Sequence, residues 1–298
     1  MRINTATISL TNLCNFKCTH CSVNSGIKLE NELSFTEIKD ILLQLKKENV
    51  KNIELSGGEP LLRKDLYKII NYCKKLEFGV KILTNGSLLN KNNLRKLKKT
   101  GLDKIAISLD GSSYEIYKKI RPVKREIFNK VLENIKMAAE SGIFVKVNTV
   151  AMKSNFKDIK DIIKLCENFG VRELRLCYLS KIGRAEKLNE AINSQLWLSF
   201  VKKLHSKNIS IYFGLNYAGF NSGCLINQEI PLYISSIGDI FLCPLSNCAG
   251  NIRNATLKNI ISTAKLNSCI NSKKIKELFK ICPLRKFSLD DIQNKTVI

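Results

Sequence analysis

Short apolar runs alternate with amphipathic patterns along roughly the first 180 residues of the chain. The strand-like runs are TATISL (5–10), NIELS (52–56), VKILT (80–84), KIAISL (104–109), VKVNTV (145–150) and ELRLCYL (173–179). Between them, apolar residues recur at i, i+3 and i+4, the spacing of a helix with one buried face. These helical patterns cover about 34–48, 64–77, 90–99, 127–141 and 155–169. Ser34 and Glu37 form a capping box that predicts the start of the first helix.

Strands that alternate with helices predict an α/β fold of parallel βα units with right-handed crossovers. A doubly wound open sheet and a barrel-like sheet both fit this pattern. In either architecture the chemistry collects at the carboxyl ends of the strands. The pattern changes near residue 210, where Gly and Asn become frequent and YISSIGDIFLC predicts a hairpin that turns at Gly238 and Asp239. We therefore predict two domains, 1–210 and 211–298.

Composition narrows the class of protein. No apolar run reaches the roughly 18 residues of a membrane helix, and the N-terminus lacks the features of a signal peptide, so we expect a cytoplasmic protein without a membrane partner. The 11 cysteines are then expected to be metal ligands or buried side chains and not disulfides. The net charge of +23 is spread over helical faces, and aromatic residues make up only 7% of the chain, so we expect no nucleic-acid partner.

The cysteines that follow the first strand have a distinctive spacing. Cys14, Cys18 and Cys21 form a Cys-x3-Cys-x2-Cys pattern. A structural zinc site takes four ligands, usually as two Cys-x2-Cys pairs, whereas a [4Fe-4S] cluster takes one cysteine per iron. Three thiolates therefore leave one iron open to a chelating ligand. Three other cysteines lie alone in periodic segments and are expected to be buried as small apolar side chains: Cys73, Cys166 and Cys177.

Further motifs follow the later strands, and each is weak evidence alone. The second strand leads into ELSGGEP, the fourth into SLDG and then YEIYKKIRP, the fifth contains VNTV, and the sixth leads to Gly183-Arg184-Ala185. In this order, over about residues 5–185, the cysteine loop and these motifs resemble the radical S-adenosylmethionine (SAM) family. The resemblance implies a partial (β/α)6 TIM-type barrel. It also implies that the open iron binds SAM, and that an electron from the cluster breaks the sulfur–carbon bond to give a 5′-deoxyadenosyl radical that abstracts a hydrogen.

The resemblance also implies which residues contact SAM. His20 stands where the family usually has an aromatic residue, and its ring is expected near the adenine. Gly57, Gly58 and Glu59 match the motif that binds the amino group of SAM. Ser108 and Asn148 are the candidates for its carboxylate or ribose, and Arg121 is a further candidate for its carboxylate. No residue is identified as a general acid or base.

The C-terminal part resembles the auxiliary-cluster extension called SPASM, or its shorter form, the twitch domain. The features that carry the resemblance are the Gly-Asp hairpin, CPLSNCAGNI and the cysteine order. By this resemblance, one auxiliary [4Fe-4S] cluster is bound by Cys224, Cys243, Cys248 and Cys282, with Cys269 as a substitute. A zinc ribbon is the alternative, but it prefers Cys-x2-Cys knuckles, which this segment lacks.

Enzymes with this core and extension mostly modify peptides or proteins. Our leading prediction is therefore a peptide maturase that crosslinks, oxidises or epimerises its substrate, with two [4Fe-4S] clusters, SAM and a flavodoxin- or ferredoxin-type electron donor. Because the chain starts at its first strand, substrate recognition is expected from the barrel mouth, the extension or a separate protein.

Two alternatives remain open. The first is a small-molecule radical SAM enzyme resembling the molybdenum-cofactor cyclase MoaA, which shares a GGEPLLR-like stretch, although this chain ends in NKTVI and not in Gly-Gly. The second is a non-enzymatic iron–sulfur electron carrier, which has no need of a SAM pocket. Formation of 5′-deoxyadenosine under reduction distinguishes an enzyme from a carrier.

Overall fold

A curved, mostly parallel sheet forms the centre of the molecule in this computed structural model, which describes residues 3–215, 232–242 and 248–267. Seven parallel strands follow one another in chain order: β1 (Thr5–Ser9), β2 (Asn52–Ser56), β3 (Gly79–Thr84), β4 (Lys104–Ser108), β5 (Phe144–Ala151), β6 (Glu173–Tyr178) and β7 (Ser210–Leu215). On the other side of β1, the sheet continues with β8 (Leu232–Ile234), β9 (Asp239–Phe241) and β10 (Gly250–Asn251). The strand order is β10-β9-β8-β1-β2-β3-β4-β5-β6-β7.

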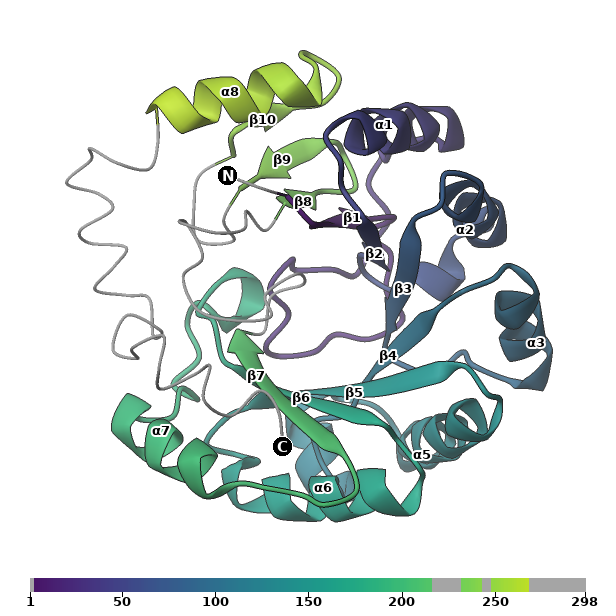
Figure 1. The fold of residues 1–298 in the computed structure, drawn as a ribbon. Helices are drawn as coiled ribbons and strands as arrows, with labels where there is room; N and C mark the ends of the chain where they lie inside the picture. Colours follow the sequence, from purple (N-terminus) through teal and green to yellow (C-terminus); the bar gives the residue numbers. More distant parts are fainter. Residues whose placement is uncertain (1–2, 216–231, 243–247, 268–298) are drawn as a thin grey trace.

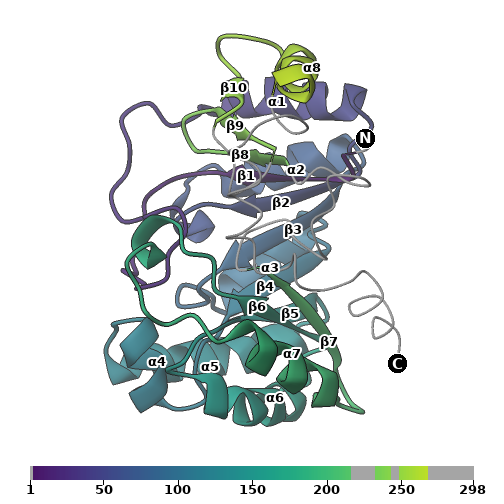
Figure 2. The ribbon, with the colours of Figure 1, turned by 90° about the vertical axis from the view of Figure 1, so that its left-hand side faces the viewer.

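The helices cover the outer face of this sheet, as Figure 1 shows. They are α1 (Phe35–Lys47), α2 (Leu66–Lys75), α3 (Lys91–Lys99), α4 (Tyr114–Ile120), α5 (Arg125–Glu140), α6 (Ile159–Asn168), α7 (Ser194–Lys203) and α8 (Leu257–Asn267). Three short 3-10 helices lie between them: η1 (Pro60–Leu62), η2 (Phe156–Asp158) and η3 (Gly183–Ala185). Figure 2 shows that α1 and α8 lie side by side at the end of the molecule formed by β8 to β10. None of the helices in the described segments has the length and apolar character needed to cross a membrane.

The two faces of the strands differ because successive side chains of a strand point to opposite sides. Outward residues such as Ile53, Leu55 and Ile105 are fully buried against the helices. Inward residues are largely polar or charged, and Thr7, Glu54 and Lys146 are examples. This combination places the apolar core between sheet and helices and leaves the inside of the barrel for polar chemistry.

The structure confirms the predicted partial barrel. All six predicted strands and five predicted helical regions are present, and Ser34 and Glu37 form the expected reciprocal capping box. The hairpin between β8 and β9 turns at Gly238, which has a φ of 91°. The sequence did not indicate α4 or β7. Because β7 pairs with β6 and β8 pairs with β1, strands on both sides of the expected boundary at residue 210 belong to one sheet, and the division into two domains stays a prediction.

Candidate active site

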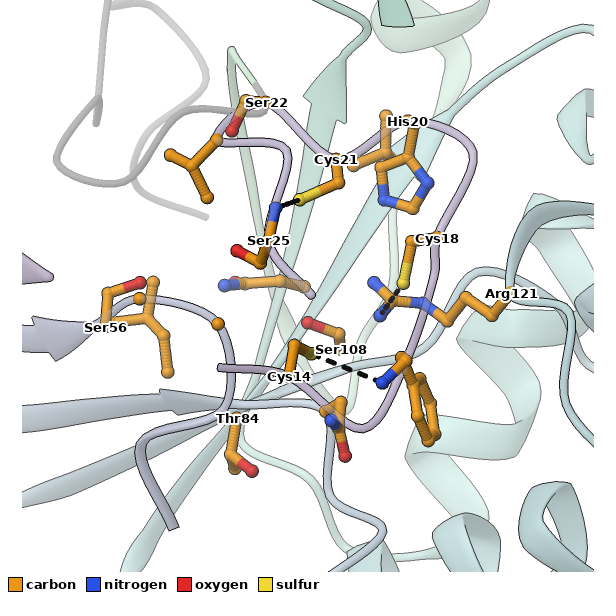
Figure 3. A pocket seen from close by; sticks show the side chains of 18 of the residues that line it. Cys14, Cys18, His20, Cys21, Ser22, Ser25, Ser56, Thr84, Ser108 and Arg121 are labelled. Carbon is orange, nitrogen blue, oxygen red and sulfur yellow. Dashed lines mark hydrogen bonds between the residues drawn. The ribbon is translucent and has the colours of Figure 1, made fainter. Parts of the chain in front are cut away.

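A cavity of about 180 Å³ opens at the carboxyl ends of the strands. The predicted ligands Cys14, Cys18 and Cys21 line it together (Figure 3). Most of the predicted SAM contacts line the same cavity: His20, Gly57, Gly58, Ser108, Arg121 and Asn148. Motifs that are up to about 130 residues apart in the sequence therefore meet in one place.

Each of the three thiols accepts one hydrogen bond from a different donor (Figure 3). The amide of Phe16 donates to Cys14 Sγ at 3.4 Å, and the amide of Ser25 donates to Cys21 Sγ at 3.4 Å. Arg121 Nη1 donates to Cys18 Sγ at 3.3 Å. Hydrogen bonds to sulfur stabilise thiolates and tune iron–sulfur clusters, so these contacts suit cluster ligands.

The cavity offers three cysteine thiols as metal ligands. Within the described ranges, no three His, Cys, Asp or Glu side chains converge closely enough to hold one metal ion. A [4Fe-4S] cluster needs no such convergence, because each cysteine binds a different iron. Burial raises the pKa of the Cys14 thiol to about 11 and also raises the pKa of Cys18. Metal binding must therefore displace protons from these thiols.

The Gly57-Gly58 turn packs directly on the cysteine loop. The amide of Gly58 donates to the Thr11 carbonyl at 2.7 Å, and the amide of Glu59 donates to the Leu13 carbonyl at 2.9 Å. A Cβ on Gly58 would lie 2.2 Å from the Leu13 oxygen, and Gly57 has a φ of 132°. Neither position accommodates a side chain in this conformation, so both glycines are needed to bring the second strand against the loop.

Glu59 is completely buried and does not line the cavity. Its carboxylate accepts hydrogen bonds from Thr84 Oγ1 at 2.7 Å, the Asn85 amide at 2.8 Å and the Leu61 amide at 3.1 Å. Burial raises the pKa of this carboxyl to about 7, although the three donors oppose the shift. In this structure Glu59 therefore fastens the turn to the end of β3, and its contact with the amino group of SAM stays a prediction.

A buried network connects the cysteine loop to the SLDG segment. Asp110 is fully buried and accepts from Arg121 Nε at 2.6 Å and from the Val150 amide at 2.8 Å. His20 Nε2 lies 3.4 Å from the same carboxylate. Burial lowers the pKa of His20 to about 4, so the ring is neutral near pH 7. Arg121, expected at the SAM carboxylate, instead joins Asp110 to Cys18 here, while its contact with SAM remains a prediction.

Arg184 contacts the cysteine loop, although the sequence assigned it no role. Its Nε donates to the Cys18 carbonyl at 2.8 Å, and its Nη1 donates to the Ser25 carbonyl at 2.6 Å and to Asn24 Oδ1 at 3.0 Å. The neighbouring Gly183 approaches so closely that a Cβ would lie 2.5 Å from the Cys21 oxygen. The Gly-Arg-Ala motif was visible in the sequence, but its contact with a loop about 160 residues away was not.

The cavity contains polar atoms that suit a bound ligand. His20 Nδ1, Ser25 Oγ and Asn148 Oδ1 are buried and have no hydrogen-bond partner among the described residues. Buried polar atoms are normally paired. Ser108 and Asn148 are direct neighbours on β4 and β5, so their side chains face the cavity from adjacent strands. The three thiols and these atoms together fit a [4Fe-4S] cluster and SAM.

The remaining cysteines fall into two groups. Cys73 and Cys166 are completely buried, as predicted, and Cys177 is buried but also lines the cavity. Of the predicted auxiliary ligands only Cys248 is described; it is exposed, and its thiol donates to the Gly250 carbonyl at 3.2 Å. The other four lie outside the described residues: Cys224, Cys243, Cys269 and Cys282. The auxiliary cluster therefore stays a prediction.

The fold and the cavity define the class of protein as a partial-barrel enzyme with a three-cysteine cluster site. Residues 8–166, more than half of the chain, match the Radical SAM superfamily, and the chain belongs to this family. Membership implies a [4Fe-4S] cluster and SAM as cofactors.

Two sets of known proteins resemble the chain. The Probable GTP 3′,8-cyclase of Saccharolobus solfataricus is 40% identical over 181 residues, covering 59% of this chain and 57% of that protein. The AdoMet-dependent heme synthase of Oleidesulfovibrio alaskensis is 30% identical over 184 residues, covering 61% of this chain and 47% of that protein. The chain thus spans only about half the length of these relatives.

Solved structures agree on the fold. Streptococcus suis SuiB bound to S-adenosylmethionine superposes with a TM-score of 0.74 at 18% identity, covering 95% of this chain and 72% of that one. Native anSMEcpe with bound AdoMet has a TM-score of 0.67 at 18% identity, covering 94% of this chain and 88% of that one. At this identity the likeness extends to the fold alone.

Proposed function

We propose that the chain cleaves SAM reductively and abstracts a hydrogen from a peptide or protein substrate. The observation that supports SAM chemistry is the shared cavity, where three hydrogen-bonded thiols face the Gly57-Gly58 turn and unpaired buried acceptors. When bound there, the cluster supplies the electron that cleaves SAM, and the resulting 5′-deoxyadenosyl radical removes the hydrogen.

The protein's own residues position these cofactors. Phe16, Ser25 and Arg121 donate to the thiols, and Arg184 holds the loop that carries them. The strand ends supply the walls of the cavity.

A peptide substrate is supported by the hairpin and helix that follow the barrel. β8 and β9 turn at Gly238, β10 pairs with β9, and α8 follows, an order that fits the auxiliary-cluster extension expected from the sequence. Such extensions mostly occur in peptide- and protein-modifying enzymes. We expect the four predicted auxiliary cysteines to bind a second cluster and a small acidic flavodoxin or ferredoxin to supply electrons to this basic protein.

A nucleotide substrate is the second candidate function. Its support is the 36–40% identity to proteins named Probable GTP 3′,8-cyclase across the first part of the chain. This similarity covers the part expected to hold the cluster and SAM, so it bears more on SAM binding than on the choice of substrate.

The proposed function is tested with anaerobically reconstituted protein, SAM and a reductant. We expect 5′-deoxyadenosine from the wild type and from Cys73→Ala, a control for thiol loss in the core, but none from the triple variant of Cys14, Cys18 and Cys21. Iron should fall from about eight to about four per chain in that variant if two clusters are bound. Absence of 5′-deoxyadenosine from iron-loaded wild type contradicts the proposal.

The substrate class is tested by isotope transfer. Deuterated peptide mixtures and deuterated GTP are supplied in separate reactions, and deuterium in 5′-deoxyadenosine is measured by mass spectrometry. Transfer from peptide and not from GTP is the expected result. Transfer from GTP alone would replace the peptide proposal with the nucleotide candidate.

A further inference from the structure

Positive charge is concentrated on two neighbouring helices, α2 and α3 (Figure 1). They contain no aspartate or glutamate, whereas α5 and α6, further along the sheet, carry as many acidic as basic residues. The basic residues of α2 and α3 form what we call the basic face: Lys68, Lys74, Lys75, Lys91, Arg95, Lys96, Lys98 and Lys99. The large net charge of the chain is therefore distributed unevenly over the helices.

Several cations of the basic face are free to meet a partner. The carboxylates at the ends of the two helices already have partners within the chain: Asp65 pairs with Arg63, Glu77 with Lys46 and Asp103 with Lys74. Three exposed lysines of the face form no ion pair with the described residues: Lys68, Lys75 and Lys91. A surface of this kind attracts acidic proteins or nucleic acids.

Aromatic rings lie among these cations, but lysines already cover them. A groove of about 370 Å³ separates α1 from α2 and is lined by Phe35, Lys39, Lys68, Asn71, Tyr72 and Lys75. Lys39 Nζ lies 5.5 Å from the centre of the Phe35 ring, and Lys96 Nζ lies 5.9 Å from the centre of the Tyr67 ring. Single-stranded nucleic acids bind by stacking their bases on open aromatic faces. The basic face lacks such an open platform among the described residues, so it favours an acidic protein.

The basic face begins at the end of the barrel that holds the predicted cluster ligands. In βα units each helix starts beyond the carboxyl end of its strand, so α2 and α3 both start at the cavity end. The segment before α3 contacts the cysteine loop directly: Asn85 Nδ2 donates to Asn15 Oδ1 at 2.8 Å, and Asn15 Nδ2 donates to Ser87 Oγ at 2.9 Å. Asn15 follows Cys14 in the chain. The segment before α2 contains Gly58, whose turn packs on the same loop.

We propose that the basic face is the docking site of the small acidic redox protein that supplies the electron. This inference rests on the proposed reductive cleavage of SAM, which requires an electron from outside the chain. In the docked complex the reduced partner loses one electron and the cluster gains it. Attraction between opposite charges speeds association of this kind and weakens as salt is added.

The test compares two double variants that lower the net charge equally. The basic-face variant combines Lys68→Glu and Lys91→Glu, which lie in the first turns of α2 and α3. The matched control combines Lys130→Glu and Lys160→Glu on α5 and α6. All four lysines are exposed, and a glutamate near a helix N-terminus interacts favourably with the helix dipole, so we expect both variants to fold.

Binding is measured with fluorescently labelled, oxidised flavodoxin by anisotropy, which requires no turnover. At about 0.01 M salt, we expect the basic-face variant to have a dissociation constant about tenfold higher than that of the wild type, and the control variant to stay within about twofold of it. Raising the salt to about 0.15 M shortens the Debye length from about 30 Å to about 8 Å. The difference between the wild type and the basic-face variant should therefore shrink.

Electron delivery is measured as 5′-deoxyadenosine formed by anaerobic, iron-loaded protein with SAM. With limiting flavodoxin, kept reduced by NADPH and its reductase, we expect the basic-face variant to react about tenfold more slowly than the wild type and the control variant. With dithionite, a small reductant that needs no docking surface, all three proteins should react at the same rate. An equal loss with both reductants would contradict a docking role.

Other results would also overturn this inference. They are wild-type flavodoxin affinity in the basic-face variant, equally weakened binding in the control variant, and a wild type that does not bind flavodoxin at low salt. If the basic-face variant loses binding of a single-stranded RNA while its flavodoxin binding is unchanged, the face belongs to nucleic acid. Formation of 5′-deoxyadenosine with dithionite does not depend on any of these outcomes, so the docking site and the proposed SAM cleavage are refuted by different observations.

Discussion

Substitution of Gly58 by alanine is expected to separate the second strand from the cysteine loop. The new Cβ would lie 2.2 Å from the Leu13 oxygen and 2.6 Å from the Leu13 carbonyl carbon, and both are backbone atoms. Real Cβ contacts essentially never fall below 3.0 Å, so the turn and the loop must separate by at least about 0.8 Å. Overpacking of this kind costs about 1–3 kcal/mol.

The same displacement should also impair cofactor binding. The Gly58 and Glu59 amides hold the loop through hydrogen bonds of 2.7 and 2.9 Å, and a shift of nearly 1 Å lengthens both beyond effective range. We expect the dissociation constant for SAM, measured by calorimetry on anaerobic iron-loaded protein, to rise about tenfold, which corresponds to about 1.4 kcal/mol.

Gly26→Ala is the matched control for this prediction. Gly26 belongs to the same cysteine loop, but a Cβ there would have no atom within 4 Å. We expect its SAM affinity and iron content to equal those of the wild type. If Gly58→Ala also retains wild-type affinity and stability, the close approach of turn and loop does not position SAM.

Three further predictions concern the residues around the thiols. Arg184→Gln should speed the loss of iron to a chelator several-fold, because the bonds to Cys18 and Ser25 weaken; Arg125→Gln, at an exposed ion pair with Glu115, should not. Arg121→Lys should lower the cluster midpoint potential in EPR-monitored titrations, since a donor to Cys18 Sγ is lost; an unchanged potential contradicts this role. Because burial raises the pKa of Glu59 to about 7, the protonated carboxyl stabilises the folded state at low pH, and this contribution declines as pH rises from about 4.5 to about 7. The free energy of unfolding of metal-free Glu59→Gln, measured in urea, should lack this part of the pH dependence, which amounts to about 3 kcal/mol in the wild type. A pH profile identical to that of the wild type would refute the shift in the pKa of Glu59.

Much of the barrel could be predicted because its signals are local. Apolar spacing identified the six strands, and Ser34 with Glu37 identified the first turn of α1. The missed elements have weak local signals: α4 has only seven residues, and β7 (SIYFGL) contains a glycine and begins at the position where the pattern changes. β7 is held by its pairing with β6, which is a tertiary effect.

The site was predictable only in part, for a similar reason. Motif spacing located the three cysteines and the glycine turn, which line the cavity as expected. Spacing could not show that Arg121 bonds to Cys18 or that Arg184 holds the same loop. The charged residues of the barrel interior did have a sequence signal: Glu54, Lys81 and Lys146 interrupt otherwise apolar strands. Such interruptions in a strand buried on both faces indicate a polar barrel interior.

The open barrel explains why such an interior is tolerated. In a closed eight-stranded barrel, bulky branched side chains fill the centre and leave no room for ligands. Here β7 and β10 are the two ends of the strand order, so the described sheet does not close on itself. The stability of the fold comes from the apolar layer between sheet and helices, where residues such as Ile53 and Ile105 are fully buried. The inner face is therefore free to carry buried charged side chains such as Glu54, Lys146 and Arg175, because the packing of the core does not depend on it.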